Sequence, residues 1–116
     1  MGFSQELQVL LDGVIDSLVK WDLIAYLQKN PNDRRSAENI AGSIGRSVDE
    51  VMQALSELSD RGILQYEDDG EAIYYRFHPS KQWQKHINAF TEGLADRNTR
   101  WLILNYLIEK HGFQQG

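Results

Sequence analysis

The sequence predicts a mainly helical α+β fold with one small β-hairpin, on three observations. Apolar residues recur with helical spacing near both ends of the chain and in its middle. Residues 63–78 instead carry β-branched and aromatic residues on both sides of an EDDG turn, which is typical of a hairpin. The chain has 116 residues, enough for one hydrophobic core. We therefore expect a single domain over residues 1–116.

The first part of the chain is expected to be helical. Ser4 can cap a helix, and apolar residues then follow helical spacing as far as Leu27. The pattern ends at Asn30, because proline at the next position disfavours a helical residue before it. We expect an N-terminal helix over residues 4–19. The spacing fits either one long helix that continues to Leu27 or two helices with a bend near Asp22.

Two shorter helices are predicted in the middle of the chain. The first lies in "SAENIAGSIG", where Ser36 is the expected N-terminal cap and Gly45 the expected stop. The second begins at a capping box, Ser47 with Glu50 three residues later, and ends at Arg61-Gly62. The apolar residues of this second helix fall on one face, which we expect to be buried: Val51, Leu55 and Leu58.

The last part of the chain begins with the hairpin and then returns to helical spacing. The hairpin strands are expected around Tyr66 and over residues 73–77. Helices are expected over residues 80–112, with a break at Gly93 or near the "DRN" sequence of residues 96–98.

The stretch "SAENIAGSIGRSVDEVMQALSELSDRGIL" resembles the helix-turn-helix of prokaryotic winged-helix transcriptional regulators, broadly the MarR and ArsR type. The resemblance covers about residues 20–78, which would form the winged-helix core. It implies a winged helix-turn-helix fold and a homodimeric, DNA-binding transcriptional regulator. The residues that fit the core and turn positions of the pattern are Ala37, Ile40, Ala41, Ile44, Val51, Leu55, Leu58, Gly62, Ile63 and Leu64.

A DNA-binding function requires residues that face the groove and cations that contact phosphate. The outward face of the helix predicted from Ser47 to Gly62 offers residues for the groove. Arginines before the helix predicted from Ser36, and one on the hairpin, can reach phosphates. The expected DNA-binding residues are Arg34, Arg35, Arg46, Ser47, Asp49, Gln53 and Arg76.

The charge distribution favours a second hypothesis. The net charge is −5, and residues 33–75 hold ten acidic and four basic residues. The hairpin tip is acidic where these regulators commonly present basic residues, with Glu67, Asp68, Asp69 and Glu71. These acids are either solvated turn residues, a surface that repels nucleic acid, or a surface that meets a basic protein. In the last case the domain is a protein-interaction module without DNA binding, anchored by Tyr66, Tyr74 and Tyr75 if they are exposed.

The two ends of the chain are unusually apolar. In "WLILNYLIEK" seven of the first eight residues are apolar, more than one helix face can bury in so small a domain. The terminal helices either close the core of one chain or, as we favour, build a symmetric homodimer. The expected interface residues are Leu7, Leu11, Val14, Leu18, Trp101, Leu104 and Ile108.

Other function classes find little support in the sequence. There is no cysteine, which excludes disulfides, thiolate metal sites and a cysteine nucleophile. His78, His86 and His111 lack the spacing of a metal site, and no glycine-rich phosphate loop occurs. We therefore expect no enzyme activity, no cofactor and no metal. Without a signal peptide or an 18-residue apolar run, a cytoplasmic location and no membrane contact are expected.

Overall fold

The computed structural model describes residues 3–112. Within them it forms two compact units, one of Val19–Trp83 and the other of the chain up to Leu18 together with the chain from Gln84 onward. The expectation of one domain over residues 1–116 stays a prediction, and residues 1, 2 and 113–116 of that range lie outside the described part. None of the described helices is both long and apolar enough to cross a membrane.

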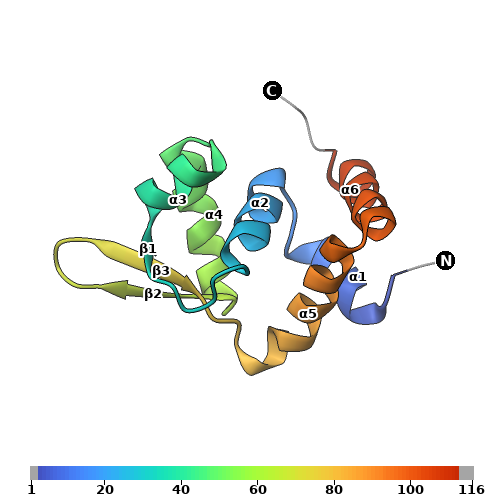
Figure 1. The fold of residues 1–116 in the computed structure, drawn as a ribbon, viewed down its shortest axis with the longest axis horizontal. Coiled ribbons are helices and arrows are strands. Elements are labelled where there is room, and N and C mark those ends of the chain that lie inside the picture. Colours follow the sequence, from blue (N-terminus) through green and yellow to red (C-terminus); the bar gives the residue numbers. More distant parts are fainter. Residues whose placement is uncertain (1–2, 113–116) are drawn as a thin grey trace. The chain divides into compact units, whose positions relative to one another are not determined.

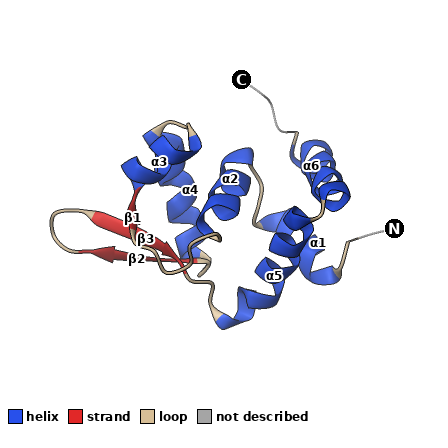
Figure 2. Cartoon of the chain, in the orientation of Figure 1, coloured by secondary structure: helices blue, strands red, loops and turns tan. Residues whose placement is uncertain are grey.

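The first unit contains helices and a three-stranded antiparallel sheet (Figures 1 and 2). The strands lie in the order β1-β3-β2, and Tyr66 of β2 pairs with Tyr75 of β3. We call β2, β3 and the turn between them the wing. The elements of this unit are α2 (Leu18–Leu27) apart from its first residue, β1 (Arg35–Ser36), α3 (Ala37–Ile44), α4 (Val48–Asp60), β2 (Leu64–Asp68) and β3 (Ile73–Phe77).

The capping signals of α3 and α4 are confirmed. The Ser36 hydroxyl accepts a hydrogen bond of 3.1 Å from the Asn39 backbone N–H, and the Ser47 hydroxyl accepts one of 3.2 Å from that of Glu50. Gly45 ends α3 with φ of 71°, a left-handed conformation that glycine adopts without a steric cost. The strongest local signals in the sequence therefore fix the start of α3 and the turn between α3 and α4.

The core of this unit is apolar with one exception. The expected inward residues of α4 are all buried, as are Ile40 of α3 and Phe77 of β3. Lys20 is only 5% exposed, because it shares one face of α2 with three buried apolar residues at helical spacing: Leu23, Ile24 and Leu27.

The second unit is helical. It comprises α1 (Gln5–Gly13), most of α5 (Lys81–Ala95) and α6 (Arg97–His111). Asp96 caps α6 by accepting a hydrogen bond of 2.9 Å from the Thr99 N–H, so the predicted break near residues 96–98 is confirmed. Gly93 instead stays inside α5. A Cβ there would lie 2.8 Å from Ile103 Cδ1, so glycine lets α5 and α6 approach closely.

Two predictions about local structure are wrong. The N-terminal helix over residues 4–19 is too long, because α1 ends at Gly13 and the break before α2 precedes Leu18 rather than lying near Asp22. The backbone N–H groups of Val14 and Ile15 both donate to the Leu10 carbonyl, which closes the helix just after a glycine of low helix propensity. The sequence also gave no sign of β1, whose two residues pair with the distant β3.

Candidate nucleic-acid interface

The outward face of α4 is exposed as expected. Asp49, Gln53, Ser56, Glu57 and Asp60 lie at the surface, opposite the buried apolar face of the same helix. Ser47 is also exposed, at the N-terminus of the helix. The face that would enter a groove is thus accessible and carries more carboxylates than cations.

Arg46, which lies just before α4, is already paired. Its Nε lies 2.7 Å from Asp22 Oδ2 of α2, and both side chains are about one-third exposed. A charge-assisted hydrogen bond of this length is stronger than a neutral one. Arg46 can contact a phosphate only by leaving Asp22 or by sharing its guanidinium between the two anions.

The two arginines before α3 lie beside a shallow cleft of about 300 Å³ at the start of that helix. Arg35 Nη2 lies 2.8 Å from Asp33 Oδ2, and its Nη1 donates to Asn39 Oδ1 at 3.1 Å. Arg34 stacks on the Tyr74 ring with its guanidinium carbon 4.8 Å from the ring centroid. The cleft thus holds Arg34 and Arg35 at the N-terminal end of α3, together with Asp33, whose carboxylate already pairs with Arg35.

Arg34 also joins this cleft to the wing. Its Nη2 lies 3.5 Å from Glu67 Oε2, and both side chains are about half exposed. An exposed pair of this kind contributes about 0–1 kcal/mol, so its exchange for a phosphate costs little.

Arg76 is on the wing, away from the helix-turn-helix arginines in sequence. Its Nε and Nη2 both donate to the amide oxygen of Gln65, its partner across the β2–β3 pair, at 3.2 and 2.9 Å. In these contacts the guanidinium of Arg76 pairs with a neutral amide and not with a carboxylate.

One negative charge on the outer face of α4 is neutralised by a lysine of α2. Lys20 Nζ of α2 lies 2.5 Å from Glu57 Oε1, and Gln53 donates to the other carboxylate oxygen of Glu57 at 3.3 Å. Sequence reasoning missed Lys20, although its spacing to Leu23, Ile24 and Leu27 was the signal for an inward position. Gln53, which we expected to face the groove, hydrogen-bonds to Glu57 on its own helix.

Two acids at the wing tip shape the turn. Asp69 Oδ1 accepts from the backbone N–H groups of Glu71 and Ala72, both at 2.9 Å, and Asp68 Oδ1 accepts from that of Gly70. The bonds from Ala72 and Glu71 lower the pKa of Asp69 below its usual value. A local structural role therefore accounts for Asp68 and Asp69.

The residues expected at a dimer interface fall into two groups. Leu7, Leu11 and Val14 are buried within the chain and cannot also form an outer surface, whereas Leu18 and Leu104 are partly exposed. Trp101 and Ile108 of α6 are exposed, and Leu102 beside them is a further exposed apolar residue that the prediction lacked. Most of the exposed large apolar residues of this unit are thus on α6, and Val9 of α1 is another.

No group of three or more histidine, aspartate or glutamate residues is arranged to hold a metal ion within residues 3–112.

The sequence matches no model of a known protein family and no curated protein. Three solved structures of transcriptional regulators are similar in fold. The repressor BigR from Xylella fastidiosa has a TM-score of 0.59 and 21% identity, over 78% of this chain and 86% of that one. A possible regulator from Methanosarcina mazei Go1 has a TM-score of 0.57 and 17% identity, over 88% and 92% of the two chains.

A possible transcriptional regulator for arsenical resistance is also similar, with a TM-score of 0.54 and 20% identity over 82% of this chain and 94% of that one. Sequence identities this low support a conclusion about the fold alone. The helix order, the wing and these likenesses agree, and the predicted fold class is confirmed: the chain has the winged helix-turn-helix fold of these regulators.

Proposed function

We propose that this chain is a DNA-binding transcriptional regulator of the winged-helix type, a cytoplasmic protein without enzyme activity that acts as a homodimer on double-stranded DNA. The observation that carries the proposal is the exposed outer face of α4, in the third-helix position of the fold, with the Arg34–Arg35 cleft at the start of the preceding helix. Proteins described as transcriptional regulators share this fold.

In this proposal Arg46, Ser47, Asp49 and Gln53 lie at the groove, where Arg46 also reaches a phosphate, and Arg34, Arg35 and Arg76 contact phosphates. Each phosphate contact replaces a contact within the chain, such as that of Arg34 with Glu67. The gain comes from counterion release, which makes affinity fall steeply with salt. We therefore expect weak binding at physiological salt and measurable binding at low salt.

A fluorescence titration with double-stranded genomic fragments at low salt tests the proposal. Arg34→Ala and Arg46→Ala should each weaken binding several-fold and reduce the salt dependence, because each removes about one phosphate contact. Arg97→Ala, an exposed arginine at the start of α6, is the matched control and should leave binding unchanged. Absence of binding at low salt, or equal binding by all variants, would overturn the DNA-binding function.

The homodimer is supported by the apolar surface of α6. Trp101 is 64% exposed and Leu102 is 55% exposed, although large apolar side chains usually gain free energy from burial. Light scattering should give twice the mass of one chain at micromolar concentration. Trp101→Lys should shift the protein to the monomer, whereas Val9→Lys, at an exposed position of α1, is the control. A monomeric wild type would remove the homodimer from the proposal.

The second candidate function is a protein-interaction module that binds a basic partner. It is favoured by Tyr66, which is 64% exposed on the wing and is followed by Glu67. A pull-down comparing wild type with Glu71→Lys tests it, since Glu71 lacks the turn-forming side-chain bonds of Asp68 and Asp69. Loss of a specific partner in Glu71→Lys, with no DNA binding by wild type, would favour this function. Identical partners for both proteins would count against it.

A further inference from the structure

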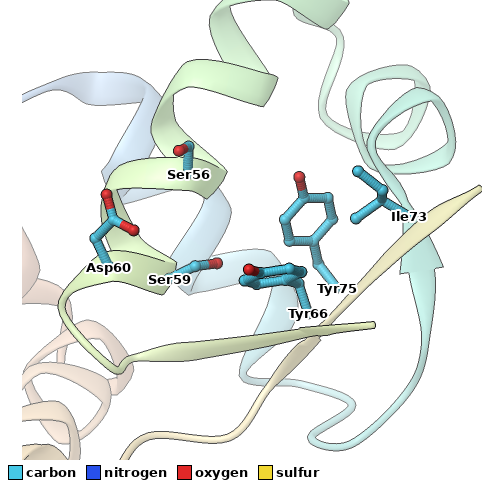
Figure 3. A pocket seen from close by; sticks show the side chains of 6 residues that line it. All are labelled: Ser56, Ser59, Asp60, Tyr66, Ile73 and Tyr75. Atoms are coloured by element: carbon cyan, nitrogen blue, oxygen red, sulfur yellow. The ribbon is translucent and has the colours of Figure 1, made fainter. Parts of the chain in front are cut away.

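A separate cavity lies between α4 and the wing, on the side of α4 that faces the two strands (Figure 3). Its volume is about 220 Å³. Three residues of α4 and three of the wing line it: Ser56, Ser59, Asp60, Tyr66, Ile73 and Tyr75. The cavity lies wholly within the Val19–Trp83 unit.

One polar group in the lining of the cavity has no hydrogen-bond partner among the described residues. Ser59 Oγ is buried and has no hydrogen-bond partner among the described residues, and Figure 3 shows it turned from α4 towards the tyrosine rings. A buried hydroxyl without a partner is unfavourable, so a ligand or water that reaches it gains binding free energy. Tyr75 is 9% exposed, and its burial raises the pKa of its hydroxyl, which therefore stays protonated at neutral pH.

The charge of the cavity selects the class of ligand. Asp60 carries the only full charge among the six lining residues at neutral pH, and it is negative. The rings of Tyr66 and Tyr75 lie 6.4 Å apart at 43° and offer aromatic surface, which attracts cations. An anion would meet Asp60 without a compensating cation in the lining.

We propose that this cavity binds an organic cation, an alkylammonium or guanidinium group on a short aliphatic chain. Asp60 pairs with the charge, the Ser59 hydroxyl accepts an N–H of the ligand, and Tyr66 and Ile73 contact its aliphatic part. A volume of 220 Å³ equals that of about seven water molecules, which suits a ligand of about five to eight non-hydrogen atoms. Ser56 and Asp60 also belong to the outer face of α4 that we propose to enter a groove, so the test below uses the chain without DNA.

Amide NMR spectra of the full chain, titrated with n-butylguanidinium or n-butylammonium, test the proposal. We expect saturable shifts at Ser59, Asp60, Tyr66 and Tyr75, and much weaker shifts with n-butanol or butyrate at equal concentration. Asp60→Asn keeps the shape of the side chain and should weaken binding about fivefold or more, because it removes the charge. Asp49→Asn, on the same helix outside the cavity, is the matched control and should leave binding unchanged.

Two results would overturn the proposal. One is equal binding of n-butanol and n-butylammonium. The other is a set of shifts confined to residues 67–71, which would show association with the acidic wing tip instead. The peptide Gly-Gly-Arg-Gly-Gly separates two sources of the ligand, because tighter binding than n-butylguanidinium indicates an arginine side chain of a partner protein. Weaker binding than n-butylguanidinium indicates a small free molecule, and either result supports a cation site.

Discussion

Lys20 Nζ of α2 lies 2.5 Å from Glu57 Oε1 of α4, and the lysine side chain is 6% exposed while the glutamate side chain is 46% exposed. An ammonium group from the core thus neutralises a carboxylate on the outer face of the third helix. The excess of acid on that face is therefore smaller than the sequence alone implies. The pair also ties α2 to α4 within the winged-helix unit.

We predict that Glu57→Gln lowers the free energy of unfolding by about 1–2 kcal/mol at neutral pH. Removing one member of a buried pair costs about 3–5 kcal/mol, and the exposure of Glu57 to water reduces this cost. Urea denaturation of wild type and variant measures the difference. Asp49→Asn, at an exposed position of the same helix, should change stability by less than about 0.5 kcal/mol. Equal stability of all three proteins would mean that Glu57 contributes little to holding Lys20 in the core.

Replacement of Gly93 and of Gly42 by alanine should have opposite effects on stability. A Cβ at Gly93 would lie 2.8 Å from Ile103 Cδ1 and 3.2 Å from Thr99 Cγ2, whereas one at Gly42 of α3 meets nothing within 4 Å. Overpacking a buried site costs about 1–3 kcal/mol, which exceeds the gain of about 1 kcal/mol in helix propensity. We expect Gly93→Ala to lower the melting temperature and Gly42→Ala to raise it. A rise in both variants would show that Ile103 repacks freely.

Asp12 makes the stability of the helical unit sensitive to acid. Its carboxylate accepts hydrogen bonds from the Tyr106 hydroxyl and from Gln8, and the bond from Tyr106 is the main cause of its lowered pKa. A lowered pKa in the folded state means that this contribution to stability is present above the unfolded value of 3.8. It is lost as the pH falls from 3.8 towards the folded value.

NMR titration of the Asp12 carboxyl in wild type and in Tyr106→Phe checks this prediction. Removal of the hydroxyl should raise the pKa of Asp12 towards 3.8, because the carboxylate loses its strongest donor. The advantage of wild type over Asp12→Asn in urea denaturation should shrink below pH 3.8. An unchanged pKa in Tyr106→Phe would contradict the assignment of its cause.

Local signals explain why much of the fold was predictable. Ser36, Ser47 and Gly45 act on backbone groups within a few residues of themselves, so their positions in the sequence fix the helix ends. The inward face of α4 followed in the same way from helical spacing. The break after Gly13 was harder to predict, because the apolar pattern continues through Val14 and Ile15, which are buried although they lie outside both helices.

The partners of the candidate site residues could not be predicted, because they depend on how distant segments pack. Arg46 and Asp22 are 24 positions apart, and Lys20 and Glu57 are 37 apart. The sequence contains many other acidic and basic residues that could have formed an ion pair with each of these four. Prediction also failed for partners close in sequence. The acidic residues of the wing tip indicated a charged surface, but the carboxylate of Asp69 accepts hydrogen bonds from backbone N–H groups of its own turn.

We predict that Asp22→Asn strengthens DNA binding at low salt by about three- to tenfold, if the proposed function holds. Asp22 Oδ2 holds the Arg46 Nε at 2.7 Å, and an asparagine of the same size holds it less strongly, so the guanidinium is released for a phosphate. One more phosphate contact corresponds to an increase of about 0.9 in the slope of log affinity against log salt. Fluorescence titration with one duplex at several salt concentrations measures both quantities.

Two further variants separate the release of Arg46 from the simple loss of a negative charge. Asp49→Asn also removes an acid near the groove-facing surface but releases no arginine, so we expect a smaller gain and an unchanged salt slope. The double variant Asp22→Asn/Arg46→Ala should lose the gain of the single variant, because the released cation is absent. If the double variant keeps the full gain, the effect comes from reduced repulsion of phosphate, and Arg46 is then not a DNA contact.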